Sequence, residues 1–125
     1  MNKNILIIDD DNLTCWGLEK IFSSRGLSVT TACSRKDAIG EFDSIPFGYV
    51  FLDVHLPDAD GLELIKEIKR ISPETKIIVM TGDDSEANKL RAFEEGAFSF
   101  VRKPFEIPEI ILLVNYPPGN ETVST

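Results

Sequence analysis

ILIIDDD, residues 5–11, joins a run of four apolar residues to three aspartates. The apolar part, Ile5 to Ile8, is short, uninterrupted and rich in branched side chains, which is typical of a strand buried on both faces of a parallel sheet. Three further runs of this kind occur along the chain: Tyr49 to Leu52, Ile77 to Met80 and Phe98 to Val101. We therefore expect a parallel sheet with these fully buried runs as strands.

A polar residue stands at or just after the end of each run. In chain order these residues are Asp9, Asp10, Asp53, Thr81 and Lys103. Parallel strands bring their carboxyl ends to one edge of the sheet, and open α/β sheets hold their ligands at that edge. We therefore predict a site at which three carboxylates, a hydroxyl and an ammonium group converge.

The rest of the chain alternates helix and strand signals. Helices are expected over residues 12–25, 34–42, 85–95 and 106–115 and along Leu64–Ile71, and one further strand over residues 27–32. Gly26 and the pair Ser72-Pro73 are expected to end the first and third helices. Five βα units in succession predict an α/β fold, a three-layer sandwich with a five-stranded parallel sheet and right-handed crossovers.

The length of 125 residues is that of one compact domain. We expect residues 1–115 to form it. Residues 116–125 contain Pro117, Pro118 and Gly119, which cannot continue a helix, so this segment is expected to be a flexible tail or the start of a linker. Whether the domain acts alone or as part of a longer protein is left open.

Composition limits the classes of function. A share of 27% charged and 42% hydrophobic residues is typical of a soluble globular protein. The net charge of -8 disfavours direct nucleic-acid binding, which needs a basic patch, and suits a cation-binding pocket. No apolar run approaches the ~18 residues of a membrane span, and MNKNILIIDD is unlike a signal peptide. Cys15 and Cys33 lack metal-ligand spacing, so a reducing, cytoplasmic location is expected.

The converging acids predict a metal ion. Three aspartates at one edge of a sheet repel one another unless a cation neutralises them. Hard oxygen ligands without a cysteine or histidine set favour Mg²⁺. An isolated Asp9-Asp10 pair would be explained more simply as the cap of the helix that follows, a role that also suits Asp11 or Asn12. The coincidence of the acids with the other strand ends favours the metal site.

Four fragments, in this order, carry a family resemblance: ILIIDDD (residues 5–11), VFLDVHLPDADG (50–61), IIVMTG (77–82) and FVRKPF (100–105). Together they make residues 4 to about 115 resemble the receiver domain of two-component response regulators. The resemblance implies a flavodoxin-like (βα)5 fold with strand order 2-1-3-4-5. It also implies a signalling phosphoacceptor that catalyses its own phosphorylation and dephosphorylation in a phosphorelay, rather than an enzyme with a separate substrate.

The resemblance implies a role for each acid. Asp53 resembles the phosphoacceptor, whose carboxylate attacks the phosphohistidine of a sensor histidine kinase or phosphotransfer protein and becomes an acyl phosphate. Asp10 resembles a direct Mg²⁺ ligand beside Asp53. Asp9 is expected nearer to the waters of the metal, and the backbone carbonyl of His55 completes the set of protein ligands.

Lys103 and Thr81 resemble the groups that neutralise and hydrogen-bond the phosphoryl oxygens. The resemblance also implies a cis peptide bond between Lys103 and Pro104. Thr81 and Phe100 resemble the switch pair that alters the surface formed by the fourth helix, fifth strand and fifth helix. Taken singly, Phe100 would be core packing, Thr81 a strand end and Lys103 a solvated cation.

Three residues depart from the common pattern of the family. His55 and Asp83 stand two positions after Asp53 and Thr81, where the family tunes the lifetime of the phosphoryl group, and the sequence leaves open which influence prevails. The side chain of His55 is read as that of an ordinary loop residue rather than as a phosphohistidine or a metal ligand. Trp16 should point away from the core, either as an anchor for a kinase or packed on the neighbouring loop.

Two other functions stay open at this stage. Haloacid-dehalogenase-type phosphatases combine similar residues, but they need a second acid two positions after the nucleophile, where this chain has His55. A binding module that keeps only the fold is the other, and the intact set of polar residues argues against it. A downstream effector domain or protein and a homodimer through the short apolar last helix are left open as partners. Neither nucleic acid nor membrane is expected to contact this domain directly.

Overall fold

The computed structural model describes residues 2–82 and 86–114, along which five strands alternate with five helices. The strands are β1 (Asn4–Ile8), β2 (Ser28–Ala32), β3 (Tyr49–Asp53), β4 (Lys76–Thr81) and β5 (Ser99–Arg102). The helices are α1 (Asn12–Ser23), α2 (Arg35–Glu41), α3 (Gly61–Ile71), α4 (Glu86–Glu94) and α5 (Ile107–Val114). The predicted succession of five βα units is confirmed, with boundaries that differ from the expected ones by a few residues at most.

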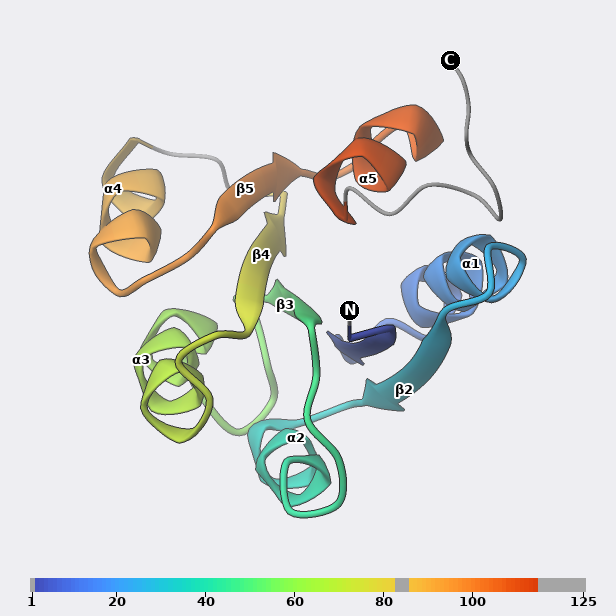
Figure 1. Cartoon of the computed structure of the whole chain (residues 1–125). Coiled ribbons are helices and arrows are strands. Elements are labelled where there is room, and N and C mark those ends of the chain that lie inside the picture. The colour runs from blue at the N-terminus through green and yellow to red at the C-terminus, as the bar shows by residue number, and fades with distance from the viewer. Residues whose placement is uncertain (1, 83–85, 115–125) are drawn as a thin grey trace.

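The strands pair in parallel in the order β2-β1-β3-β4-β5. Helices α1 and α5 cover one face of the sheet, and α2, α3 and α4 cover the other (Figure 1). This is the predicted three-layer α/β sandwich with the flavodoxin-like strand order. The helices that follow β1 and β3 leave toward opposite faces, so a ligand site is expected at the carboxyl ends of these two strands.

The central strands are buried on both faces, as their apolar composition predicts. Leu6 of β1 packs into the core under α2, α3 and α4, whereas Ile5 and Ile7 pack into the core under α1 and α5. Phe51 of β3 belongs to this second core, and its ring centroid lies 5.2 Å from that of Phe22 in α1. Two cores therefore fix the sheet from both sides and hold its carboxyl edge in place.

Side chains at the helix ends explain where the helices begin and stop. Asp11 caps α1 by accepting a hydrogen bond from the backbone amide of Leu13 at 3.0 Å, so the third aspartate of ILIIDDD is the capping one. Ser34 caps α2, and Asp60 caps α3. Gly26 follows α1 with φ 82°, a left-handed conformation that suits glycine and ends the helix.

The expected burial of the last strand is wrong. Within the run Phe98 to Val101, Phe98 is 50% exposed, Ser99 and Phe100 are half-buried, and only Val101 is fully buried. The strand lies at the edge of the sheet. Among the described side chains of α4, which covers it, only Ala92 is buried. An edge strand under so thin an apolar layer cannot bury all of its side chains.

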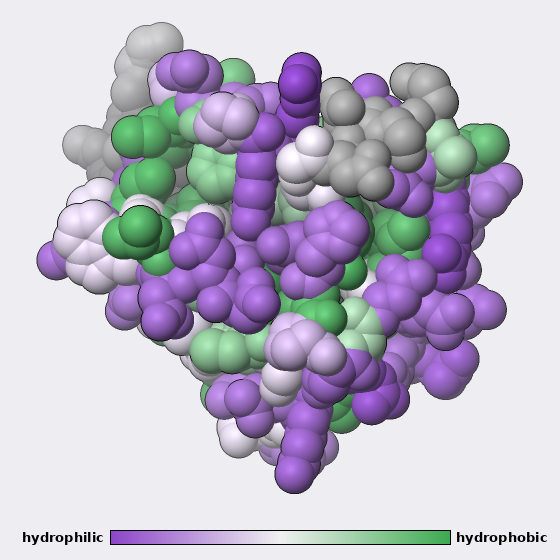
Figure 2. Space-filling model, turned by 180° about the vertical axis from the view of Figure 1, so that it is seen from behind, coloured by the Kyte–Doolittle hydropathy of each residue, from purple (hydrophilic) through white to green (hydrophobic). Residues whose placement is uncertain are grey.

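The last two helices leave large apolar side chains exposed: Leu90 and Phe93 in α4, and Ile107 and Leu112 in α5. Among the described side chains of α4, only Ala92 is buried, so its apolar stripe is thin. On the face of the molecule shown in Figure 2, hydrophilic side chains predominate and hydrophobic ones form small areas between them. Within residues 2–82 and 86–114, no helix is long and apolar enough to cross a membrane. The predictions for Asp83 and for residues 116–125 fall outside the described residues.

Candidate functional site

The carboxyl ends of β1 and β3 bring three aspartates together. Asp9, Asp10 and Asp53 each offer a carboxylate oxygen, and these oxygens lie within 4.8 Å of one another. Asp9 is fully buried, Asp53 is 8% exposed, and Asp10 is open to solvent. The predicted convergence of the acids is confirmed, and it occurs where open α/β sheets hold their ligands.

The side chain of Lys103 stands between two of these acids. Its Nζ donates to Oδ2 of Asp9 at 2.7 Å and to Oδ2 of Asp53 at 3.1 Å. Its backbone amide donates to the carbonyl of Thr81 at 2.8 Å, which ties the segment after β5 to the end of β4. The peptide bond from Lys103 to Pro104 is cis, as the resemblance implied. The positive group thus lies in the predicted place.

Asp9 is fastened through both its side chain and its backbone. Its Oδ1 accepts from the backbone amide of Asp11 at 2.9 Å, while its Oδ2 accepts from Lys103. Its own amide donates to the carbonyl of Ala32 at 3.0 Å, and its carbonyl accepts from the thiol of Cys15 at 3.4 Å. Each carboxylate oxygen of Asp9 therefore already has a donor within the protein.

Burial and charge shift the pKa values of the two partners of this ion pair. Burial raises the pKa of the Asp9 carboxyl, although the hydrogen bond from Lys103 opposes the rise. Burial by itself would lower the pKa of Lys103, but its hydrogen bonds to Asp9 and Asp53 outweigh burial and hold that pKa above its ordinary value. Lys103 is therefore an ammonium ion at neutral pH.

Asp53 ends β3 with its carboxylate held between a cation and a backbone donor. Its Oδ2 accepts from Lys103, and its Oδ1 accepts from the backbone amide of His55 at 3.0 Å. Gly61, the first residue of α3, packs against the backbone of Asp53 and Val54. A Cβ atom at Gly61 would stand 2.7 Å from the carbonyl oxygen of Asp53 and 2.5 Å from the Cα of Val54, so only glycine fits at this position.

The two predicted switch residues lie on the strands beside the acids. Thr81 is buried at the end of β4, where it pairs in register with Arg102 of β5. Phe100 pairs with Val79 and packs, half-buried, against the core under α2, α3 and α4. Phe100 therefore lies two residues before Arg102, the register partner of Thr81.

His55 and Trp16 are both exposed. His55 pairs with Asp60 through an isolated antiparallel bridge, as suits a loop residue. Trp16 points away from the core, as its helical position predicted, and the Nζ of Lys20 lies 5.7 Å from the centroid of its ring. Neither side chain belongs to the core clusters.

Sequence reasoning missed Asp58 and Asp60, which fasten the loop between β3 and α3. Asp60 caps α3, and Asp58 accepts hydrogen bonds from the backbone amides of Arg35 and Lys36 at the start of α2. An aspartate followed by Gly61 and an apolar periodic run is an N-terminal helix signal that could have revealed Asp60. No local signal marks Asp58, whose partners lie 23 and 22 residues earlier.

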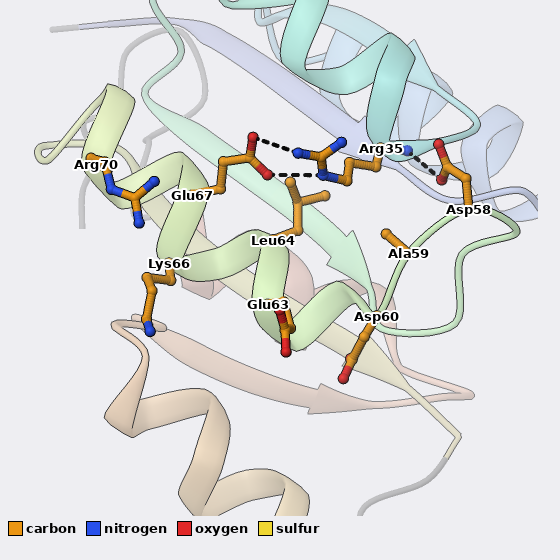
Figure 3. Close-up of a pocket in the computed structure, with 9 residues that line it drawn as sticks. All are labelled: Arg35, Asp58, Ala59, Asp60, Glu63, Leu64, Lys66, Glu67 and Arg70. Carbon is orange, nitrogen blue, oxygen red and sulfur yellow. Dashed lines mark hydrogen bonds and ion pairs between the residues drawn. The ribbon is translucent and has the colours of Figure 1, made fainter.

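Several hollows lie near the loops that carry the site. An apolar groove of about 460 Å³ between α1 and the segment after β5 is lined by Leu13, Thr14, Gly17, Leu18, Ile21, Lys103, Pro104 and Phe105. A charged hollow of about 520 Å³ lies where α2, α3 and the loop before α3 meet (Figure 3). The first shares Lys103 with the acid cluster, and the second contains none of the clustered acids in its lining.

A buried acid pair, a third exposed acid and a bridging lysine thus lie together at the carboxyl edge of a doubly wound sheet, where open α/β sheets hold their ligands. The family model of the response regulator receiver domain matches residues 5–115. The chain therefore belongs to the response regulator receiver domain family, and the resemblance carried by the four fragments is confirmed. Domains of this family are signalling phosphoacceptors of two-component systems and bind Mg²⁺ at a cluster of aspartates.

Individual relatives agree with this assignment. The chain is 34% identical over 109 residues to the DNA-binding transcriptional regulator NtrC of Klebsiella pneumoniae, covering 87% of this chain but 23% of that protein. It is 30% identical over 116 residues to the chemotaxis protein CheY of Thermotoga maritima, covering 92% of this chain and 97% of that protein. The beryllofluoride-activated NtrC4 receiver domain dimer superposes with a TM-score of 0.86 at 32% identity, covering 90% of this chain and 93% of that one.

Proposed function

We propose that Asp53 accepts a phosphoryl group from the phosphohistidine of a sensor histidine kinase or phosphotransfer protein. The observation that carries this proposal is the contact of one Asp53 oxygen with Lys103 while the residue keeps a small opening to solvent. Asp9 shares Lys103 but is fully buried, and Asp10 is exposed without a hydrogen bond from that ammonium. Of the three acids, Asp53 alone combines access with a neutralising cation.

The chemistry follows from these positions. An oxygen of Asp53 attacks phosphorus, the bond from phosphorus to the imidazole nitrogen breaks, and its electron pair returns to the imidazole. The product on this chain is an acyl phosphate. Lys103 offsets the negative charge on the phosphoryl oxygens, and the hydroxyl of Thr81 donates a hydrogen bond to them. Attack by water on the same phosphorus regenerates the carboxylate, which is the self-dephosphorylation that we assign to this site.

The residues present fit a bound Mg²⁺. Three carboxylates face one ammonium group, so negative charge remains in excess, and the carboxylate donor set consists of hard oxygens. Asp10 and Asp53 would hold the ion directly, with Asp9 nearer to its waters and the backbone carbonyl of His55 as a further ligand. When bound, Mg²⁺ supplies charge neutralisation and alignment for phosphoryl transfer.

Thr81 and Phe100 are proposed to pass the change at Asp53 to the surface formed by α4, β5 and α5. Two features support this route. Thr81 ends β4, which lies between β3 and β5, and the half-buried Phe100 lies on the edge strand β5. The covering helix α4 buries only Ala92 among its described side chains, so little apolar contact opposes its displacement.

The partners are inferred from the surface around the site. The apolar groove between α1 and the segment after β5 includes Lys103 in its lining, and Leu13 and Trp16 are exposed on α1. This surface suits a helix of the phosphodonor, with Trp16 as an anchor. The chain spans about a quarter of the length of the NtrC relative that it matches. We also propose that the domain acts in the cytoplasm and passes its signal to a downstream effector domain or protein. It is further proposed to form a homodimer.

The direct test is phosphotransfer measured by intact mass. Wild type and Asp53→Asn are incubated in Mg²⁺ with acetyl phosphate or a phosphorylated histidine kinase. Wild type should gain one phosphoryl group, and the variant, whose amide is a poor nucleophile, should gain none. Removal of Mg²⁺ with a chelator should abolish labelling of the wild type. Equal labelling of Asp53→Asn would place the acceptor on another residue.

A further inference from the structure

The loop between β3 and α3, residues 54–60, is hydrogen-bonded to α2 through the side chain of Asp58. Oδ1 of Asp58 accepts from the backbone amide of Arg35 at 2.8 Å, and Oδ2 accepts from the backbone amide of Lys36 at 3.2 Å. Figure 3 shows this carboxylate turned toward the first turn of α2. Two amides that have no partner within the helix are thus satisfied by a residue of another loop.

The first residue of α2, to which the loop is bonded, is itself held against α3. The guanidinium group of Arg35 makes two bonds to Glu67 of α3, from Nε to Oε1 at 2.9 Å and from Nη2 to Oε2 at 2.8 Å (Figure 3). A bidentate pair of this kind holds geometry better than a single contact. The loop is thus joined to α2 through Asp58, α2 is joined to α3 through Arg35 and Glu67, and the loop itself leads into α3.

The other end of the loop reaches the acid cluster. The amide of His55 donates to Asp53, His55 pairs with Asp60, and the amide of Gly61 donates to the carbonyl of Val54 at 2.9 Å. Only Leu56 and Pro57 separate His55 from Asp58, and proline restricts the backbone on both of its sides. His55 and Asp58 thus lie in one short segment whose backbone freedom is limited by Pro57.

We propose that Asp58 is a positioning residue for the phosphoryl site. By capping α2 it holds the loop so that the amide of His55 meets Asp53 and the carbonyl of His55 is placed for the metal. The inference rests on the proposed function, because it assigns His55 to the Mg²⁺ ligands. The hydrogen bond from the amide of Arg35 also lowers the pKa of the Asp58 carboxyl, so the cap is ionised at neutral pH.

The competing explanation is that Asp58 only stabilises α2. The chain offers a matched control, because Ser34 caps the same helix from within its own segment. Oγ of Ser34 accepts from the backbone amide of Asp37 at 3.2 Å and makes no hydrogen bond to loop 54–60. Ser34→Ala therefore weakens the same end of α2 and leaves the loop attached. Asp58→Asn is an intermediate variant, because its amide oxygen still accepts one hydrogen bond.

The experiment measures Mg²⁺ affinity by isothermal titration, together with hydrogen exchange at the amide of His55, in wild type and the three variants. Asp58→Ala should bind Mg²⁺ roughly tenfold more weakly, as expected for the loss of a residue that orients a ligand. Its His55 amide should exchange faster, and Asp58→Asn should show a smaller change of the same sign. Ser34→Ala should match the wild type in both measurements.

Phosphorylation by acetyl phosphate separates positioning from chemistry. Asp58→Ala should need roughly tenfold more Mg²⁺ for half-maximal labelling and reach the wild-type rate at saturation. Equal effects of Ser34→Ala and Asp58→Ala, or wild-type Mg²⁺ affinity in both Asp58 variants, would overturn the proposal. Failure of the wild type itself to bind Mg²⁺ or take up phosphate would instead contradict the proposed function. If Asp58→Ala does not fold, Asp58→Asn decides alone.

Discussion

Helices α3 and α4 are neighbours on the same face of the sheet, yet they are held in different ways. The first turns and middle of α3 bury four large apolar side chains: Leu62, Leu64, Ile65 and Ile68. Each fully buried side chain of this size contributes about 1.5–3 kcal/mol. Among the described side chains of α4, only Ala92 is buried, and Leu90 and Phe93 are exposed. The molecule thus fixes the helix that follows Asp53 and holds the next one loosely.

Polar contacts do not remove this difference. Arg91 of α4 reaches Asp60 at 3.1 Å and Glu63 at 3.5 Å, but these ion pairs lie at the surface. Exposed pairs contribute about 0–1 kcal/mol each, so they cannot replace an apolar core. The comparison teaches that, under the proposed function, the acid site and the surface formed by α4, β5 and α5 have separate mechanical requirements. The acids need fixed neighbours, and a switch needs a helix that moves at small cost.

The largest expected effect is the difference in stability lost when an apolar side chain is shortened in α3 or in α4. Ile65→Ala in α3 should lower the free energy of unfolding by about 2–5 kcal/mol, because it leaves a cavity in a fully buried position. Leu90→Ala in α4 should change it by no more than about 0.5 kcal/mol. Urea titration of both variants measures the two values. Similar losses in the two variants would show that α4 is packed as firmly as α3.

The next effect concerns the cation of the site. Lys103→Met keeps the length of the side chain but removes the charge beside Asp53. Labelling by acetyl phosphate should slow by about 100-fold, the size of effect seen when one stabilising donor is lost. Rapid quench followed by intact mass measures the rate. Lys66→Met, an exposed position on α3, is the matched control and should label at the wild-type rate. A wild-type rate in Lys103→Met would contradict the assigned role.

Binding of Mg²⁺ should stabilise the acid site and the loop of residues 54–60 before it affects α4. At a Mg²⁺ concentration ten times the dissociation constant, the wild type should gain about 1.4 kcal/mol of stability. Asp10→Asn, which removes one carboxylate, should gain less. Mg²⁺ alone should slow hydrogen exchange in residues 54–60 and leave α4 unchanged. Addition of beryllofluoride should then alter α4. A change of hydrogen exchange in α4 on addition of Mg²⁺ alone would show that the acid site and α4 are not mechanically separate.

The smallest effect tests the surface ion pairs. Arg91→Gln should lower global stability by at most about 1 kcal/mol, because its partners Asp60 and Glu63 are exposed. Hydrogen exchange within α4 should nevertheless become faster, whereas α3 should not change. Lys66→Gln removes the same charge from the surface of α3 and serves as the control. Unchanged exchange in α4 of Arg91→Gln would mean that these contacts do not restrain the helix.

The parts of the fold and site that follow from local pattern could be predicted. Asp9, Asp53 and Lys103 each end an apolar run or lie shortly after one, and parallel pairing necessarily brings such positions to one edge. The burial of Phe98 could not be predicted in this way, because it depends on which strand lies at the sheet edge and on how α4 covers it. Composition of the strand alone carries neither fact.

Contacts between distant loops and helices also escaped prediction. The carboxylate of Asp58 meets Arg35 across 23 positions, and Asp60 meets Arg91 across 31. Neither pair belongs to a repeating pattern, since each depends on how two loops or helices approach in space. The positions of Asp53 and Lys103 at one site could be anticipated because several strand ends agree, whereas Asp58 has only its own contact to identify it.

The central claim is that Asp53 is the residue that receives the phosphoryl group. Its direct test is to phosphorylate the wild type in Mg²⁺, reduce the acyl phosphate with borohydride and locate the reduced residue by tandem mass spectrometry. Reduction converts a phosphorylated aspartate into homoserine, so the position is read from the fragment masses. We predict homoserine at position 53 and unmodified aspartates at Asp9 and Asp10. Homoserine at either of those two positions, with Asp53 intact, would contradict the account.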